Sequence, residues 1–312
     1  MKYIMKKIYT LVITLFMVSF LTFIAFQVIP GDSAVTSLGT NATEEAIEAL
    51  REELGLNENV FVRFFTWIGN TLQGDFGKSF QYELPVKSLV GDRMPVTLWL
   101  SLLSIIIILI VSIPLGILTA KKEGGFIDRL ITLITNTSMA IPPFFLGMII
   151  TLVFGFVLKW FIPGRYVNPS DNFGQFIRFL IFPALAIGIP KIAMVVKFLR
   201  SSVLRQLKQD YVRTARSKGQ KENTILYRHV LKNALIPVIT FIAMVIADIM
   251  AGSIIIEQVF GLPGLGRLLV TSISNRDYPV VQIIILYIAA VVVIVNFIVD
   301  ILYQYIDPRV RV

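Results

Sequence analysis

Long runs without a charged side chain dominate the pattern of hydrophobic and polar positions along this chain. Four runs contain no Asp, Glu, Lys or Arg, and they cover residues 8–29, 96–120, 130–158 and 280–299. Two further apolar runs carry one charge each: residues 179–196 contain Lys191, and residues 233–256 contain Asp248. Because a helix needs roughly 20 apolar residues to cross the hydrocarbon core of a bilayer, the pattern predicts six transmembrane helices.

The runs are uniformly apolar rather than alternating, which separates them from the strands of a membrane barrel. Backbone polar groups in lipid must be satisfied within the chain, and a helix does this inside each run. The predicted fold class is therefore an all-α polytopic membrane protein.

The first run follows Lys2, Lys6 and Lys7 as a secretory signal would, but it is too long and "FQVIPGDS" offers no small-residue cleavage site. We expect it to remain as the first transmembrane helix.

Basic residues are concentrated in alternate segments between the runs. With the N-terminus placed in the cytoplasm, the inner segments contain Lys2, Lys6 and Lys7, three basic residues between 121 and 129, and ten between 197 and 232. Short cytoplasmic loops are enriched in Lys and Arg, so we expect both termini in the cytoplasm. This topology explains much of the net charge of +9, and with no nucleic-acid-binding motif we expect no nucleic-acid partner.

Residues 31–95 form the sizeable external segment, in which two short helices are expected. "NATEEAIEALREELGL" (41–56) has the amphipathic pattern of a helix lying on the membrane or on the outer ends of the transmembrane helices, and "VFVRFFTWIGNTLQ" (60–73) indicates a second helix. The following "GDFGKSF" contains the GKS of a phosphate-binding loop, but Leu72 stands where that loop needs its first glycine. We interpret it as a glycine turn and expect Ser79 to be accessible from outside the cell.

Four residues inside the apolar runs are candidates for the translocation pathway: Pro142, Pro143, Lys191 and Asp248. The adjacent prolines should break or kink the third helix, and the irregularity serves either helix packing or the lining of a substrate path. Lys191 and Asp248 lie deep in the fourth and fifth helices, where charges face the bundle interior or water and often pair. A mutual ion pair and a direct substrate contact both fit this pattern.

A hydrophilic, strongly basic stretch, "YVRTARSKGQKENT" (211–224), separates the fourth and fifth apolar runs. Its spacing predicts a short helix with Ala215 and Gly219 on one face, where small side chains let another protein approach closely. Gly219 is also suited to ending this helix. The following "NTILYRHVLKNALIP" (223–237) is amphipathic and leads into the fifth run. The pattern therefore predicts a short cytoplasmic helix shaped to fit a partner protein.

This segment resembles the EAA loop of binding-protein-dependent ABC importer permeases, and specifically of the dipeptide/oligopeptide/nickel permease family. The family pattern Asp-Tyr-Val-Arg-Thr-Ala-Arg-x-Lys-Gly is matched from Asp210 to Gly219, its later His at His229, and Asn-Ala-Leu-x-Pro from Asn233 to Pro237. "IPGDS", "GDFGKS", "EQVFGLPGLGRLL", "NRDYPVVQ" and "VDILYQYIDPRVR" extend the resemblance over essentially the whole chain. As the subfamily allows, Arg-Thr replaces the Glu-Ala of the general EAA pattern.

The resemblance implies a type I ABC importer permease fold with a cytoplasmic coupling helix, in the bacterial cytoplasmic membrane. The implied partners are a homologous second permease subunit, two ATP-binding subunits and an external solute-binding protein, besides the lipid bilayer. The implied substrate is a di- or oligopeptide, with nickel or a metal chelate as the alternative. Coupling to the ATPases is expected through residues 209–222, with these candidate contacts: Tyr211, Arg213, Thr214, Ala215, Arg216, Lys218 and Gly219.

No enzymatic function is expected, because the sequence lacks a phosphate-binding loop and a catalytic cluster, so ATP hydrolysis would reside in partner subunits. With no cysteine and one histidine, no cofactor or metal site is expected. The chain is expected to divide into an N-terminal transmembrane helix (1–30), an external segment (31–95) and a five-helix permease core (96–312), with the EAA-type loop at about 197–235. A stand-alone secondary transporter is the rival class, and only the importer requires a co-purifying ATPase.

Overall fold

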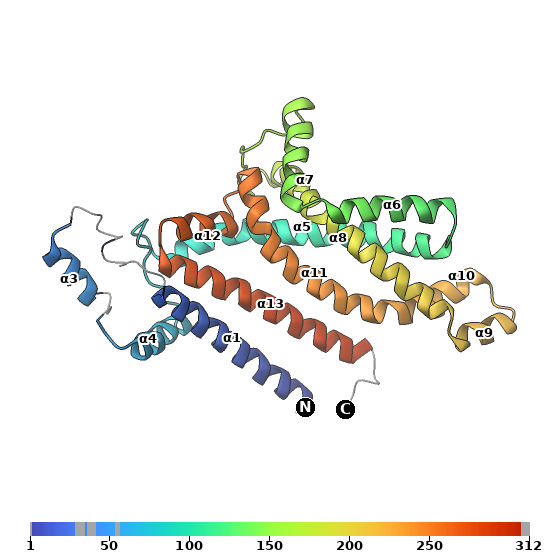
Figure 1. Cartoon of the computed structure of the whole chain (residues 1–312), viewed down its shortest axis with the longest axis horizontal. Coiled ribbons are helices and arrows are strands. Elements are labelled where there is room, and N and C mark those ends of the chain that lie inside the picture. The colour runs from blue at the N-terminus through green and yellow to red at the C-terminus, as the bar shows by residue number, and fades with distance from the viewer. Residues whose placement is uncertain (1, 29–34, 36–41, 54–56, 307–312) are drawn as a thin grey trace. The chain divides into compact units, whose positions relative to one another are not determined.

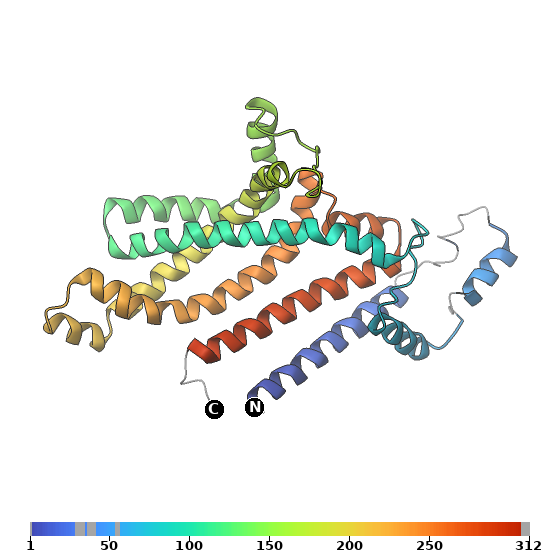
Figure 2. The same ribbon diagram turned by 180° about the vertical axis from the view of Figure 1, so that it is seen from behind.

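The computed structural model describes residues 2–28, 35, 42–53 and 57–306, which form helices joined by turns (Figures 1 and 2). The "IPGDS" stretch, Asn41 at the expected start of the first external helix, and the last residues of "VDILYQYIDPRVR" lie outside the described residues. The all-α fold class is confirmed.

Five helices of the described chain are long and apolar enough to cross a membrane. They are α1 (Lys2–Val28), α5 (Val86–Lys121), α8 (Phe173–Leu207), α11 (Leu231–Phe260) and α13 (Tyr278–Ile306). α11 is preceded without a break by the short α10 (Glu222–Thr224) and the π-helical turn η2 (Ile225–Val230). Five of the six predicted transmembrane runs are thereby confirmed as helices of sufficient length.

The third predicted run is broken into two helices. α6 (Phe126–Ala140) is followed by α7 (Pro143–Ile150), which continues into the π-helical η1 (Thr151–Val157), and the two parts are bent by 101°. A residue that precedes a proline is driven towards extended backbone, and both Ile141 (ψ 121°) and Pro142 (ψ 139°) adopt it. Two consecutive prolines therefore produce a full break, so the pair is either one bent span or a re-entrant segment.

The described chain divides into two compact units. Unit 1 comprises residues 1–97 and 263–294, and unit 2 comprises residues 98–262 and 295–312. α5 and α13 each contribute to both units. The expected division into residues 1–30, 31–95 and 96–312 describes consecutive segments of the sequence. The two units are defined by packing in space and do not test it, so it stays a prediction.

In unit 1, an aromatic cluster joins α1 to the external segment. Both expected external helices are present, as α3 (Glu44–Glu53) and α4 (Val60–Leu72). Phe64 of α4, only 1% exposed, contacts Phe16, Phe20 and Phe23 of α1, with ring centroids 5.3 to 5.6 Å apart. The three α1 phenylalanines recur every three or four residues and so share one helix face. This phenylalanine face of α1 holds α4 in place through Phe64.

The "GDFGKSF" stretch forms a turn that is anchored by the C-terminal part of unit 1. Gly77 has a φ of +74°, and its N–H donates to Asp75 Oδ1 at 3.0 Å, which confirms the glycine turn. The Ser79 hydroxyl donates to Oδ2 of Asp277, and the Phe80 N–H donates to Oδ1 at 3.0 Å. Ser79 is only 3% exposed, so the expectation that it is accessible is wrong: the buried Asp277 holds it inside the unit.

Unit 2 is organised around α8, which lies between α6 and α11 (Figure 1). Small residues let its helices approach closely. A Cβ on Gly116 of α5 would lie 2.9 Å from Leu199 of α8, and a Cβ on Gly147 of α7 would lie 3.2 Å from Phe260 of α11. Such contacts are typical of membrane helices, whose association depends on close van der Waals packing because lipid is as apolar as the side chains.

Replacing Asp277 by alanine should destabilise unit 1, because the buried Ser79 hydroxyl and the Phe80 N–H would lose their acceptor. Each buried group left unsatisfied costs about 1–3 kcal/mol, so we expect a lower thermal-unfolding midpoint for the purified chain in detergent. Asp92, which is exposed on α5, provides a matched control, and Asp92→Ala should leave the midpoint unchanged. Equal midpoints for the two variants would show that the Asp277 contacts do not stabilise the unit.

Candidate coupling and translocation sites

A short helix is held beyond the end of the fourth apolar run, where the sequence predicts the coupling segment. α8 does not stop at Val196 but continues to Leu207, which adds about 16 Å at 1.5 Å per residue. α9 (Asp210–Ser217) follows, and α10 then returns the chain to α11. Figures 1 and 2 show α9 beyond the ends of α8 and α11. The predicted short helix is confirmed.

One side of α9 faces its own chain and the other is exposed. Val212 is fully buried, Ala215 is 8% exposed, and the helix packs against η2. The opposite side, which we term the coupling face, consists of four exposed residues: Asp210, Arg213, Thr214 and Ser217. Ala215 therefore helps to fix α9 on its own chain. This placement revises the expectation that Ala215 offers a close contact to a partner.

Gly219 ends α9 through its backbone. It adopts the left-handed region at a φ of +74°, its N–H donates to the Arg216 carbonyl at 2.9 Å, and the Gln220 N–H donates to the Ala215 carbonyl at 3.3 Å. This pair of bonds is a Schellman ending, which favours glycine because glycine has no Cβ to strain. The helix-ending role predicted for Gly219 is confirmed, whereas packing on an ATPase stays a prediction.

The cations of this segment differ in how firmly they are paired within the chain. Arg216 binds Glu222 through two parallel hydrogen bonds, Nε to Oε1 at 2.7 Å and Nη2 to Oε2 at 3.1 Å, and these raise the pKa of Arg216. Arg213 lies 3.6 Å from Asp210, with both side chains largely exposed. Lys218 is exposed as well. Because the bidentate pair is the stronger arrangement, Arg213 and Lys218 are more accessible to a partner than Arg216.

Two further contacts hold the segment in place. The Tyr211 hydroxyl donates to Gln206 Oε1 at 3.0 Å, near the end of α8. His229 Nε2 lies 3.0 Å from Gln220 Oε1, which connects η2 to the turn after α9. Tyr211 and His229 therefore act inside the chain, and an additional contact of Tyr211 with an ATPase stays a prediction.

The structure brings together Lys191 and Asp248, the two charges inside the apolar runs. The Lys191 ammonium and the Asp248 carboxylate form an ion pair that joins α8 to α11. Only 15% of the Lys191 side chain is exposed, against 56% for Asp248. Met244, one turn away on α11, is also exposed, and a Cβ at Gly252 would meet no other atom within 4 Å. The surface around Asp248 is therefore open in this chain, and substrate contact stays a prediction.

Pro142 and Pro143 lie at the break between α6 and α7, where Pro142 is exposed and Pro143 is half-buried. The break directs α7 onto α8 and α11, against which it packs. The packing role is thus visible in the fold. A role of the prolines in lining the substrate path stays a prediction.

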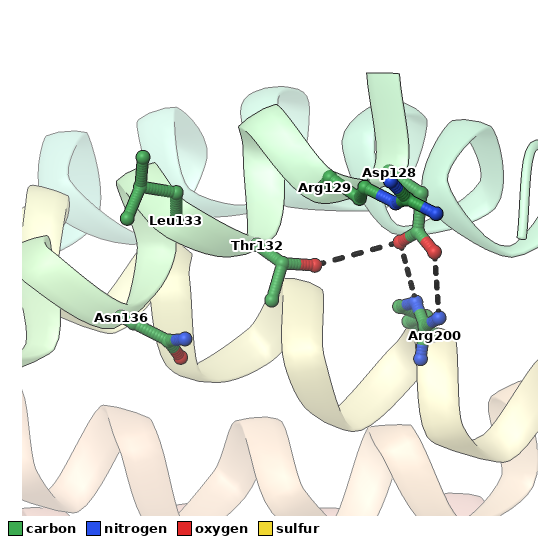
Figure 3. Close-up of a pocket in the computed structure, with 6 residues that line it drawn as sticks. All are labelled: Asp128, Arg129, Thr132, Leu133, Asn136 and Arg200. Atoms are coloured by element: carbon green, nitrogen blue, oxygen red, sulfur yellow. Dashed lines mark hydrogen bonds and ion pairs between the residues drawn. The ribbon is translucent and has the colours of Figure 1, made fainter. Parts of the chain in front are cut away.

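A second polar cluster in unit 2 has no counterpart among the residues predicted from the sequence (Figure 3). Arg200 of α8 donates through Nε to Asp128 Oδ1 at 2.8 Å and through Nη2 to Oδ2 at 2.7 Å. Asp128 also accepts from the Gly124 N–H at 2.9 Å and from the Thr132 hydroxyl at 3.4 Å. This carboxylate, only 4% exposed, is therefore well satisfied and ties the start of α6 to α8.

The polar face of α6 continues beyond this pair. Lys197 of α8 donates to Asn136 Oδ1 at 3.0 Å. Asp128, Thr132 and Asn136 are spaced four residues apart and so share one side of the helix. That spacing is the signal by which the sequence could have indicated the cluster. Asp128, Thr132 and Asn136 line one cavity (Figure 3). Its full lining is Asp128, Arg129, Thr132, Leu133, Asn136 and Arg200.

These features define the class of protein. The described residues form helices with five or six apolar spans, an ion pair between two of them and a short helix held beyond them, which is the architecture of a polytopic membrane protein. Among the described residues, no group of three or more His, Asp or Glu side chains is arranged to hold a metal ion.

The chain belongs to the family of binding-protein-dependent transport system inner membrane components. The family's main region matches residues 112–312, and its N-terminal region matches residues 1–101. The family resemblance seen in the sequence is confirmed. The chain is accordingly a multi-pass inner-membrane ABC transporter permease subunit and not an enzyme.

Three named relatives resemble this chain over essentially its whole length. The oligopeptide transport system permease protein AppB of Bacillus subtilis is 39% identical over 99% of both chains. The glutathione transport system permease protein GsiC of Escherichia coli is 37% identical, over 100% of this chain and 99% of its own. A probable peptide ABC transporter permease of Sinorhizobium fredii is 35% identical over 99% of both chains.

Separate substitution of Lys191 by methionine and of Asp248 by asparagine should each lower the membrane level of the chain or its uptake activity. Each change leaves the other charge at membrane depth without the attraction that offsets its desolvation cost in the pair. The double variant should recover part of the loss, as measured by immunoblot of membranes and by uptake. Lys232→Met, at an exposed lysine outside the pair, serves as the control. Purely additive losses would mean that the two side chains do not support each other.

Proposed function

We propose that this chain forms half of the translocation pathway of an ATP-driven importer that carries peptides across the cytoplasmic membrane. The names of its relatives support peptides over nickel or a metal chelate, since they refer to peptides, oligopeptides or glutathione. The observation that carries the coupling role is α9, a helix fixed on its own chain by Val212 and Ala215 while its other side is exposed.

Two features of unit 2 support an aqueous path beside α7 and α11. Non-helical backbone at membrane depth is tolerated only where protein or water covers it, and the break after Ile141 leaves Pro142 exposed. A carboxylate at depth likewise avoids hydrocarbon, and Asp248 is more than half exposed. We therefore assign these exposed positions to the side that faces the path, which a homologous second permease subunit completes.

The energy for transport comes from partner subunits in this proposal, because the sequence has no phosphate-binding loop. Two ATP-binding subunits each receive one coupling helix, α9 of this chain and its equivalent in the second permease. Arg213, Thr214 and Ser217 present the contact surface, with Lys218 at its edge. An external solute-binding protein delivers the peptide on the opposite side of the membrane.

The packing of α9 suggests how motion is passed on. α9 rests on η2, and the chain is helical without interruption from Glu222 to Phe260, so a displacement of α9 moves α11. Tyr211 connects the same segment to the end of α8. ATP-driven closure of the ATPases would thus shift α8 and α11 together around the Lys191–Asp248 pair. The change belongs to the rigid-body hinge or shear kind.

Adding bulk to the coupling face should uncouple the ATPase without unfolding the chain. Ser217→Trp should retain normal membrane levels because Ser217 is exposed, but co-purification of the ATPase and uptake should fall severalfold. Ser88, an exposed serine at the start of α5, gives the matched control Ser88→Trp, which should leave ATPase association unchanged. Normal association in Ser217→Trp would contradict the proposed coupling role of α9.

Position 219 allows a second test of the coupling role, in which asparagine and aspartate, two side chains of nearly equal shape, replace the glycine. Its positive φ strains most side chains, but Asn and Asp tolerate the left-handed region. Gly219→Asn and Gly219→Asp therefore disturb the backbone alike and differ only in charge. A greater loss of ATPase association in Gly219→Asp than in Gly219→Asn would indicate an electrostatic contact at this position, whereas equal losses would assign the effect to the helix ending.

Arg213→Ala should reduce ATPase association less than the changes at Ser217 and Gly219, since exposed ion pairs contribute roughly 0–1 kcal/mol.

Single cysteines can test the proposed orientation directly, because the chain has no native cysteine. Gln81→Cys, exposed beside the anchored Ser79, should react with a membrane-impermeant thiol reagent in intact cells. Ser217→Cys should react only after the membrane is opened. The reverse pattern would place the termini outside and overturn the charge-based topology.

A further inference from the structure

α4 carries three distinct surfaces along its length. At 3.6 residues per turn, successive residues are about 100° apart around the helix axis, and this sorts the side chains into three arcs. The first arc faces protein and includes Phe64 (1% exposed) with the half-buried Trp67. The second arc is polar and exposed, and it consists of Thr66, Asn70 and Gln73.

The third arc is apolar and largely exposed. It consists of Phe61, Val62, Phe65 and Leu72, which are 59%, 53%, 60% and 82% exposed. Gly69 lies within the same arc, and a Cβ there would meet no other atom within 4 Å. Two phenylalanines, a valine and a leucine on one side of a short helix form a patch of the kind that marks an interaction surface.

The depth of α4 along α1 indicates what covers this patch. Phe64 contacts α1 between Phe16 and Phe23, within the apolar span Met5–Phe26. At 1.5 Å per residue, these contacts lie about 5 to 15 Å from the Phe26 end of the span. Helices that lie in the plane of a membrane bury their apolar face about 5–10 Å into the boundary between headgroups and acyl chains. α4 therefore packs against α1 at the depth of such a helix.

The neighbouring surface of α1 also indicates that lipid covers this apolar patch of α4. Met17 and Leu21 of α1 are 46% and 59% exposed, and a membrane span of a transporter places such residues against lipid. Trp67, which lies 5.8 Å from the Phe23 ring, is the residue type enriched at membrane interfaces. α3, in contrast, is acidic and exposed at Glu44, Glu45, Glu48 and Glu52, which disfavours contact with anionic headgroups.

We propose that α4 is an in-plane membrane anchor whose face of Phe61, Val62, Phe65 and Leu72 contacts the acyl chains of the bilayer, with Thr66, Asn70 and Gln73 turned to water. The contact with lipid depends only on α1 being a span, whereas its assignment to the outer leaflet rests on the proposed topology. α4 leads directly into the turn that Asp277 anchors, so lipid contact at α4 restrains the external end of unit 1.

Fluorescence quenching tests this proposal in the assembled transporter, because the chain has no native cysteine to label. Phe61→Cys and Phe65→Cys probe the apolar arc, and Thr66→Cys and Gln73→Cys are matched controls on the polar arc of the same helix. Each variant is purified with its co-purifying subunits, labelled with bimane and reconstituted into phosphatidylethanolamine–phosphatidylglycerol vesicles with or without brominated acyl chains. The cysteine-free parent serves as the labelling blank.

Brominated lipid should quench the labels at positions 61 and 65 roughly twofold or more above those at 66 and 73, since only the former would reach the acyl chains. Aqueous iodide should give the opposite order. Equal quenching by brominated lipid on both arcs overturns the proposal, and so does an apolar arc that neither quencher reaches, because protein would then cover it. Val62→Cys and Leu72→Cys probe the same arc if a phenylalanine variant fails to reach normal membrane levels.

Outer-leaflet assignment is tested separately from lipid contact. With the Gln81→Cys and Ser217→Cys accessibility pattern reversed, lipid quenching at positions 61 and 65 would still support an in-plane anchor, but in the inner leaflet. Failure of the proposed topology and failure of the lipid contact are therefore distinguishable.

Discussion

The need to satisfy every backbone polar group away from water governs how this chain is built. In hydrocarbon, only an uninterrupted helix supplies partners for its own N–H and C=O groups, and five long apolar helices follow that rule. The break at Ile141–Pro142 departs from it, because Pro142 and Pro143 supply no N–H and impose extended backbone before them. The departure is tolerable only beside protein or water, and α7, which follows the break, packs on α8 and α11.

α8 serves as the common support of unit 2, and its polar contacts explain how. On one side Arg200 and Lys197 bind Asp128 and Asn136 of α6. Towards α11, Lys191 pairs with Asp248, and the Ser202 hydroxyl donates to the Ala234 carbonyl at 2.8 Å. Polar contacts between membrane helices specify which faces meet, since apolar side chains gain little by leaving lipid for one another. A helix held in this way on both sides, and connected to α9 at its end, can move together with its neighbours.

Unit 1 uses different means, because much of it lies outside the apolar spans. Its aromatic cluster sets α4 against α1, and the buried carboxylate of Asp277 fixes the glycine turn that follows α4. The Leu265 N–H also donates to the Thr97 hydroxyl at 2.9 Å, which ties α12 (Leu265–Ser274) to α5. Each of these contacts joins segments far apart in the sequence, and together they hold α4, the turn after it and α12 in place within unit 1.

The sequence by itself determined the helical membrane class, the position of each apolar run, the glycine turn, the short helix at Asp210–Ser217 and its ending at Gly219. These features depend on composition, periodicity and local backbone preference, all of which act over a few residues. It also placed Lys191 and Asp248 at depth, and the EAA-type motif indicated the family before any geometry was considered.

Only the tertiary structure decided which side of each element is covered. Ala215 and Gly219 are four residues apart, yet Ala215 is buried on η2 while Gly219 acts through its backbone, because a neighbouring segment selects the face that packs. Ser79 is enclosed by Asp277, and Asp128 meets Arg200, across separations of 198 and 72 residues. Such pairings follow from how helices are arranged in space, and a pattern that repeats every three or four residues carries no information about a partner that far along the chain.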